Sequence, residues 1–300
     1  MWQQLPTGCL SWAPAHSLRA GQALAAAGMP EGHTIHRAAR DHEQDLRGQP
    51  VRISSPQGRF DAEAVAGPEG EARLLRVEAC GKHLFYFFEG AQIVHVHLGL
   101  FGKFKRRRSP APEPRPTTRM RLEGAKWTID LVGPTACELL TDEERGELMA
   151  RLGPDPLRDD SDPAAFYRYT ARSRAPIGAI LMDQSRIAGV GNVYRAEVLH
   201  LEGIHPDTPG SKVPAEKLQT LWLLIVGLLR RGVEEKRIVT TRGLTLEKPR
   251  ERVPRSESTY VYGRKECRSC GGEVIRYLLR ARSVYVCEGC QPRVESGADA

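Results

Sequence analysis

The chain has 300 residues, of which 40% are hydrophobic and 27% charged, with a formal net charge of +7 and an isoelectric point near 9.1. This length allows two or three domains, and no apolar run approaches the roughly 20 residues of a membrane-spanning helix, so we expect no membrane partner. A basic balance of this size favours an anionic macromolecule, with nucleic acid ahead of a membrane surface.

The first 28 residues differ from the rest of the chain. They contain Trp2, Cys9 and Trp12 but little amphipathic period. No basic segment precedes a long apolar core of the kind that an export signal needs. We interpret residues 1–28 as either a disordered extension or the product of a start codon placed too early, with the globular chain beginning at Met29.

Residues 29–145 contain short runs of β-branched and aromatic residues separated by turn residues, which is the pattern of antiparallel strands. The predicted strands are residues 51–53, 74–77, 83–88, 93–98 and 127–131. We therefore predict an antiparallel β-sandwich in this region. The proline-rich segment 110–116 is predicted to be a loop between two strands.

The region 146–255 is predicted to be helical. Thr141-Asp142-Glu143-Glu144 just before it is typical of a helix start. Apolar residues then recur with helical spacing at 177–181 and again at 216–231.

A glycine-rich turn lies between these two helical segments. Gly189 and Gly191 are predicted to break the first helix, and Asn192 to cap the next one. Free backbone N–H groups and the helix dipole at such an N-terminus attract an anion. The residues leave two interpretations open: a plain corner between helices, or a clamp for a phosphate group.

Four cysteines near the C-terminus have the spacing C-x₂-C-x₁₆-C-x₂-C, at Cys267, Cys270, Cys287 and Cys290. Two such pairs can surround one tetrahedral Zn²⁺ with four thiolates, and the residues between them suggest a β-hairpin that needs the metal to fold. Disulfides are the alternative, although a basic chain without an export signal argues against them. We predict a structural zinc finger at 256–292 and a disordered tail at 293–300.

Basic residues are clustered at 103–108, 230–231 and 250–255. A single run of this kind is often only a solvated loop, but three of them beside a zinc finger favour contact with a phosphate backbone. The expected fold is α+β, with an N-terminal antiparallel β-sandwich, a helical domain and a C-terminal β-hairpin zinc finger.

Several short motifs follow one another in a characteristic order before the cysteines. They are Met-Pro-Glu-Gly at 29–32, Gly-Lys at 81–82, His-Leu-Gly-Leu-Phe-Gly at 97–102, Leu-Gly-Pro-Asp-Pro-Leu at 152–157, the segment 183–192, and Val-Tyr-Gly-Arg at 261–264. The series resembles the formamidopyrimidine-DNA glycosylase and endonuclease VIII family of base-excision repair enzymes over residues 29–292. The Pro-Glu-Gly start is closer to the endonuclease VIII branch, in particular to its actinobacterial type. The resemblance implies a helix-two-turn-helix arrangement for the helical domain.

The resemblance implies catalytic roles for Pro30, Glu31 and Lys82. An N-terminal proline is a nucleophile because free α-amino groups titrate near about 8, and Pro30 would attack C1′ of the damaged nucleotide. Glu31 would act as general acid/base in sugar ring opening, and Lys82 would hold a phosphate and favour the deprotonated amine. A proline inside a chain has only an amide nitrogen, so we expect the mature chain to begin at Pro30.

Other residues are implied to contact DNA. Leu100 and Phe101 have the position of an apolar wedge that fills the gap left by a flipped nucleotide, with burial in the sandwich as their alternative. Asn192 would bind a phosphate. Arg282 has the position of the zinc-finger arginine that grips phosphates around the flipped nucleotide, which also makes it part of the catalytic set, and Arg280 is its nearest competitor.

One departure from the family pattern concerns the lesion pocket. The family often has a glutamate where this chain has Thr34, preceded by His33, so the preferred lesion stays open. We expect a monomeric, cytoplasmic, nucleoid-associated DNA glycosylase and AP lyase that acts on oxidised bases, with oxidised pyrimidines as the expected class. The strand would be nicked by β- or β,δ-elimination. The alternative is a non-catalytic zinc-finger protein that binds damaged or structured nucleic acid.

Overall fold

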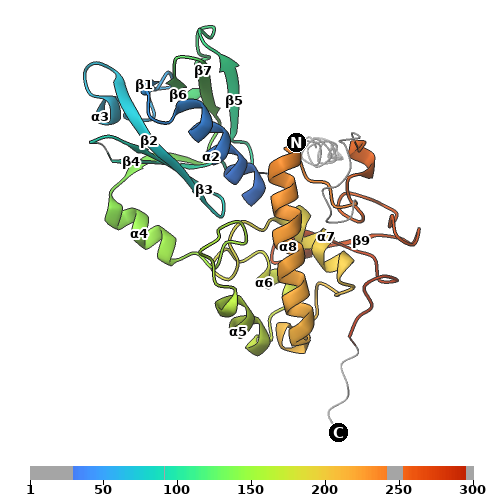
Figure 1. The fold of residues 1–300 in the computed structure, drawn as a ribbon. Coiled ribbons are helices and arrows are strands. Elements are labelled where there is room, and N and C mark those ends of the chain that lie inside the picture. The colour runs from blue at the N-terminus through green and yellow to red at the C-terminus, as the bar shows by residue number, and fades with distance from the viewer. Residues whose placement is uncertain (1–29, 91, 242–252, 295–300) are drawn as a thin grey trace, which may run out of the picture.

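The computed structural model describes residues 30–90, 92–241 and 253–294, which form a β-rich lobe and a helical lobe (Figure 1). The expectations for residues 1–28 and for 295–300, and part of the basic run 250–255, lie outside these ranges. In the described ranges, no helix combines the length and the apolar character needed to cross a membrane.

The β-rich lobe is one continuous antiparallel sheet in the strand order β5-β7-β6-β1-β2-β3-β4-β8. Its strands are β1 Pro50–Ser54, β2 Glu71–Cys80, β3 His83–Phe88, β4 Ile93–His97, β5 Lys103–Arg108, β6 Thr118–Glu123, β7 Trp127–Val132 and β8 Ala136–Leu140. All five predicted strands are present. The sequence analysis missed β5, β6 and β8, and the basic run 103–108 is itself a strand.

The sheet folds over at β2, so that its two halves face each other. The start of β2 pairs with β1 and the rest with β3, and the register shifts between Leu74 and Arg76. One core contains Ile53 of β1 and Leu122 of β6 together with Leu84 of β3. The predicted antiparallel sandwich is confirmed.

Strand β3 is buried on both faces because a helix covers its outer side. Leu84 and Tyr86 point into the core of the sandwich, whereas Phe85 and Phe87 belong to a second cluster with Leu148 of α4 (Asp142–Ala150). Helix α4 starts at a capping box formed by Thr141 and Glu144, as its sequence predicts.

Helix α2 (Gly32–Leu46) begins two residues after Pro30, and Glu31 is its N-cap residue. Its buried residues Ile35, Ala38, Ala39 and Leu46 recur at helical spacing. They belong to the core of the sandwich, and α2 also packs against α8 (Ala215–Glu235) of the helical lobe. The short helix α3 (Glu63–Ala66) covers β1 and β2.

The helical lobe is built around α8, the long orange helix of Figure 1. Its other helices are α5 Ala164–Arg172, α6 Ile177–Ile180, α7 Asn192–Leu201 and the 3₁₀ turns η1 Gly210–Lys212 and η2 Arg255–Glu257. Their apolar faces form a separate core around Phe166, Tyr194, Leu221 and Ile225. Helix α6 ends at Ile180, well before Gly189, so the predicted break of that helix by the glycines is wrong; the segment between them is a series of turns.

The C-terminal unit is the expected β-hairpin. Strands β9 (Ile275–Leu279) and β10 (Arg282–Val286) pair antiparallel, and Arg280 and Ala281 form the turn with φ of 46° and 61°. A two-residue turn with both residues at positive φ matches the twist of a hairpin. The unit packs on α7 through Ala196 and Val261, which places β10 beside the start of that helix.

Candidate active site

The side chain of Glu31 occupies the N-terminus of α7. Its Oε2 accepts a hydrogen bond from Gly191 N and its Oε1 one from Val193 N, both at 2.9 Å. Gly191 is the N-cap residue and Asn192 the first helical residue, so the prediction that Asn192 caps this helix is wrong. The carboxylate replaces the missing side-chain cap, because it satisfies free N–H groups and interacts favourably with the helix dipole. The anion at this helix end is therefore the protein's own carboxylate.

Glycines allow the two lobes to meet closely at this point. Gly32 N donates to Gly189 O at 2.8 Å. A Cβ on Gly191 would lie 2.3 Å from Cδ of Glu31, which leaves no room for any side chain. Gly81, with φ of +57°, lies so close that its Cβ would be 3.0 Å from that of Ala188.

Three distant segments contribute Glu31, Lys82 and Arg282, whose side chains lie close enough for their charges to affect the pKa values of Glu31 and Lys82. Burial raises the pKa of Glu31, which is 1% exposed, while the charge of Lys82 and the N–H groups of α7 oppose the shift. Desolvation lowers the pKa of Lys82; the charge of Glu31 opposes this shift and that of Arg282 adds to it. The structure thus brings these three predicted residues together beside Pro30.

Asp155 holds the turn that carries Lys82. Its Oδ2 accepts hydrogen bonds from Gly81 N at 2.7 Å and from His36 Nε2 at 2.8 Å, and its Oδ1 accepts one from Leu157 N at 2.9 Å. The motif at 152–157 was recognised in the sequence, but this role of its aspartate was not. Buried and fully bonded, Asp155 ties the β2–β3 turn to α2 and to the link between the lobes.

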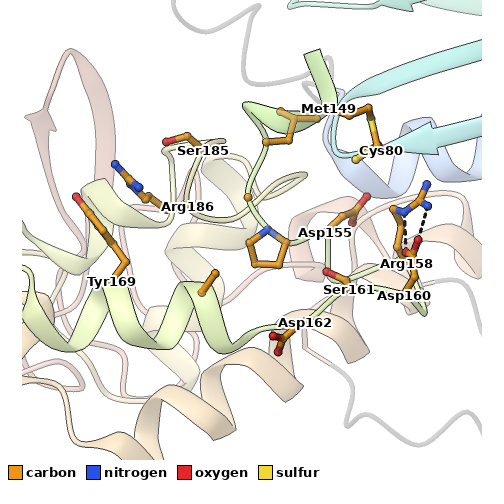
Figure 2. A pocket seen from close by; sticks show the side chains of 14 residues that line it. Cys80, Met149, Asp155, Arg158, Asp160, Ser161, Asp162, Tyr169, Ser185 and Arg186 are labelled. Atoms are coloured by element: carbon orange, nitrogen blue, oxygen red, sulfur yellow. Dashed lines mark hydrogen bonds and ion pairs between the residues drawn. The ribbon is translucent and has the colours of Figure 1, made fainter. Parts of the chain in front are cut away.

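Asp155 also borders the cavity drawn in Figure 2. This cavity of about 470 Å³ is lined by Cys80, by the paired Arg158 and Asp160, and by Tyr169. It contains neither Glu31 nor Lys82 among its lining residues, so it lies behind the Lys82 turn and not at the reacting groups.

Arg195 connects α7 to the strand that begins with Arg282. It donates hydrogen bonds to Asn192 Oδ1, to Ser283 O at 2.7 Å and to Gly178 O at 3.3 Å. Burial lowers its pKa to about 10, which leaves it cationic at neutral pH. Because Ser283 follows Arg282 directly, Arg195 holds the main chain that presents Arg282, whereas the competitor Arg280 lies in the hairpin turn. Sequence analysis did not single out Arg195.

Glu197 is a second buried charge that the sequence analysis missed. Its carboxylate accepts hydrogen bonds from the backbone N–H groups of Tyr260, Val261 and Tyr262 and from Oγ1 of Thr240. It therefore fixes the Val-Tyr-Gly-Arg motif against α7. Burial raises the pKa of the Tyr262 hydroxyl, and the side chain of Asn192 opposes this shift.

Leu100 and Phe101 lie in the loop that follows β4. They are 50% and 72% exposed, so the alternative of burial in the sandwich does not hold. Gly99 precedes them with φ of +64°, and its Cβ would lie 1.8 Å from Oγ1 of Thr135. The loop is thus packed closely on the start of β8 while its two apolar side chains face solvent.

The four cysteines form one compact cluster. All four Sγ atoms lie within 4.8 Å of one another, with 3.8 Å between those of Cys267 and Cys290 and 3.5 Å between those of Cys270 and Cys287. Four thiolates at about 2.3 Å around a tetrahedral ion are about 3.8 Å apart, so the cluster fits a metal ion. No disulfide joins cysteines in the described part of the chain, which counts against the disulfide alternative.

Comparison with known proteins gives matches over most of the chain. The family models "Formamidopyrimidine-DNA glycosylase N-terminal domain" and "Formamidopyrimidine-DNA glycosylase H2TH domain" match residues 29–134 and 152–243. Endonuclease 8 1 of Mycobacterium tuberculosis is 44% identical over 269 residues, which are 88% of this chain and 100% of the relative. Formamidopyrimidine-DNA glycosylase of Thermus thermophilus is 30% identical over 278 residues, covering 88% of this chain and 98% of the relative.

Solved structures share the fold. A crystal structure of Lactococcus lactis formamidopyrimidine-DNA glycosylase, bound non-covalently to DNA with an AP site, superposes with a TM-score of 0.71 at 21% identity. The match covers 88% of this chain and 100% of that chain. It extends through both lobes and supports the α+β architecture described above.

Proposed function

The chain belongs to the formamidopyrimidine-DNA glycosylase family, and on this basis we propose that it is a DNA glycosylase and AP lyase of base-excision repair. The single observation that carries the proposal is the convergence of Glu31, Lys82 and Arg282 beside Pro30. The partner is DNA that contains oxidised bases or abasic sites. The protein acts as a monomer, in the cytoplasm and on the nucleoid.

Pro30 is the proposed nucleophile, in a mature chain that begins at this residue. Its nitrogen forms a bond to C1′ and loses its proton, while the bond from C1′ to the base breaks with the electron pair leaving on the base, which takes up a proton. Glu31 delivers a proton to O4′ as the sugar ring opens, which leaves an iminium between Pro30 and C1′. Loss of the C2′ proton then expels the 3′ phosphate, and a second elimination can expel the 5′ phosphate.

The remaining residues of the site hold the DNA. Lys82 and Arg282 bind phosphates next to the lesion, and Asn192 binds a further phosphate through its amide. Leu100 and Phe101 fill the gap that the flipped nucleotide leaves in the stack. Their exposure on a loop of the rigid sandwich supports this role.

A cavity of about 620 Å³ is the proposed pocket for the flipped base. Glu31 and Lys82 are not among its lining residues, but Val193, whose N–H donates to Glu31 Oε1, connects it to the reacting groups. His33, Thr34, Val193 and Tyr262 line it, together with five basic residues: Arg37, Lys236, Arg237, Arg255 and Arg264. Burial lowers the pKa of His33 to about 3, so this histidine is neutral, and its Nδ1 has no hydrogen-bond partner among the described residues. The basic lining residues can donate hydrogen bonds to the carbonyl oxygens of an oxidised base, and oxidised pyrimidines are the proposed class.

Borohydride trapping tests the proposed reaction. A duplex with one abasic site, incubated with the protein and borohydride, is expected to give a covalent adduct whose peptide maps to Pro30. A protein that only binds damaged DNA would shift the same duplex in a gel and form no adduct, and that result would favour the alternative function.

We propose that the metal held by the four cysteines is Zn²⁺ and that its role is structural. Replacing Cys267 with alanine is expected to release the ion and to weaken binding of abasic DNA by about 10–100-fold, because β10 no longer holds Arg282 in place. Metal content by mass spectrometry and affinity by fluorescence anisotropy check this. Cys137→Ala, a thiol outside the cluster, serves as the control and should keep both properties; unchanged affinity in the metal-free variant would contradict the proposal.

A further inference from the structure

Three histidines and a glutamate form a polar cluster beside the Lys82 turn. His83 lies in β3, His95 and His97 in β4, and Glu138 in β8, on three neighbouring strands. His83 is paired with His97 across the sheet, and His95 with Glu138. None of the residue roles described above involves this cluster.

Hydrogen bonds join three of these side chains into a chain. Glu138 Oε1 lies 2.9 Å from His95 Nδ1, and His95 Nε2 lies 2.9 Å from His83 Nδ1. The rings of His83 and His95 are stacked, with centroids 5.1 Å apart and an interplanar angle of 20°. The ring of His97 lies 4.9 Å from that of His83 but is tilted by 42°.

The hydrogen bonds from Glu138 through His95 to His83 determine which ring nitrogens carry hydrogen. A carboxylate oxygen only accepts, so Nδ1 of His95 must donate to Glu138, and Nε2 of a neutral His95 must then accept. Nδ1 of His83 is therefore the donor, and Nε2 of His83 keeps a lone pair. Burial lowers the pKa of His83 to about 3, and the neighbouring His95 and His97 add to this shift, followed by Arg151 and Lys82. Burial also lowers the pKa of His95, against the opposing effect of Glu138, so both rings are neutral at neutral pH.

The hydrogen-bonded side chains lie next to the two parts of the sandwich that are proposed to contact DNA. His83 follows Lys82 directly, and His97 directly precedes the loop that carries Leu100 and Phe101. Thr135, just before β8, donates from its N–H to His97 O at 2.9 Å and packs on Gly99. Burying apolar side chains at positions 83 and 95, beside Phe85, would cost less free energy than burying imidazoles. Apolar side chains could not form the hydrogen bonds that fix the orientation of the two rings.

We propose that Glu138 and His95 are positioning residues that, through His83, hold the Lys82 turn in a fixed orientation against the loop of Leu100 and Phe101. Phosphate binding by Lys82 and insertion of the two apolar side chains then occur at a fixed spacing. Nε2 of His83 carries no hydrogen, so it cannot donate a hydrogen bond to a phosphate. Of the two neighbouring residues, Lys82 is therefore the one that donates to the phosphate. The inference rests on the proposed function of Lys82 and of the loop.

Glu138 is the most informative residue to replace, because its side chain is 54% exposed and its loss leaves no cavity in a core. Glu138→Ala removes the acceptor and is expected to slow the single-turnover rate of strand nicking on saturating abasic DNA about tenfold, with little change in the DNA concentration that gives half of the maximal rate. Glu138→Gln keeps an acceptor oxygen and should retain the rate within about twofold. Glu89→Ala, an exposed glutamate next to the end of β3, is the control and should leave the rate unchanged.

Equal rates for the alanine and glutamine variants, or a loss of rate that follows a drop in melting temperature, would overturn the proposal. NMR spectra of the histidine rings at neutral pH give a readout that does not depend on activity. Hydrogens on Nδ1 of both His83 and His95 are expected, with the His95 signal lost in Glu138→Ala; the opposite tautomers would refute the chain. If the wild-type protein forms no adduct but shows these tautomers, the proposed function fails and the hydrogen-bonded chain stands.

Discussion

A chain that retains Met29 before Pro30 is expected to form no borohydride adduct with abasic DNA, whereas a chain that begins at Pro30 is trapped. In the longer chain the proline nitrogen belongs to an amide, whose lone pair is delocalised into the carbonyl group and cannot attack C1′. The difference should reach at least about 10³-fold, the scale on which loss of a nucleophile acts. Trapped product on denaturing gels and the mass of the modified peptide measure it.

Pro30→Gly in a chain that begins at residue 30 is the matched control. It keeps a free amine, in primary form, and is expected to trap at a reduced but measurable rate. An adduct of equal yield in the Met29-containing chain, located on a lysine, would show that Pro30 is not the nucleophile.

Glu31→Gln is expected to lower excision of an oxidised base by about 10²–10⁴-fold, the range in which general acid–base catalysis acts. Glutamine keeps an oxygen for one N–H of α7, but its amide hydrogens are not acidic, so it cannot deliver a proton to O4′. Single-turnover release of an oxidised pyrimidine measures the effect. Glu43→Gln, in the helix α2 that follows Glu31, is the control, and intact excision by Glu31→Gln would remove Glu31 from its proposed role.

The pH dependence of this variant has a defined sign. Burial raises the pKa of Glu31, so the folded protein binds this proton more tightly than the unfolded chain. The stabilising contribution of this group is therefore present at low pH and is lost as pH rises through the raised pKa. Wild-type excision should fall over the same interval because the general acid loses its proton, while Glu31→Gln should show neither the fall in rate nor the loss of stability.

Local patterns in the sequence predicted much of the fold. The alternation of apolar residues located five strands, and the spacing of the cysteines predicted a compact cluster that the structure contains. Strand β5 was missed because its sequence Lys-Phe-Lys-Arg-Arg-Arg does not alternate between apolar and polar residues. Its Arg106 forms an ion pair with Asp45 of α2, and this contact between distant segments cannot be predicted from a short stretch of sequence.

The site was predicted less completely because its contacts connect distant segments through backbone atoms. Asn192 was assigned as a cap because asparagine is common there, but the actual acceptor comes from Glu31. Arg195 and Glu197 bind main-chain groups, whose identity the sequence does not encode. A sign of both residues was nevertheless present in the sequence. Helix α7 is buried along almost its whole length, and a charged side chain inside such a helix needs a partner.

The contact between Glu31 and the start of α7 has a consequence for how this protein can evolve. Glu31 and Gly191 are 160 residues apart in the chain, yet neither can change without affecting the other, because the Glu31 side chain occupies the space of a Cβ at position 191. Recombination between two relatives at the junction of the two lobes would take position 31 from one relative and position 191 from the other. Residues 30–32 and 189–193 are therefore expected to be inherited as one unit, and chimaeras of parents that differ at these positions should lose the contact between Glu31 and the start of α7.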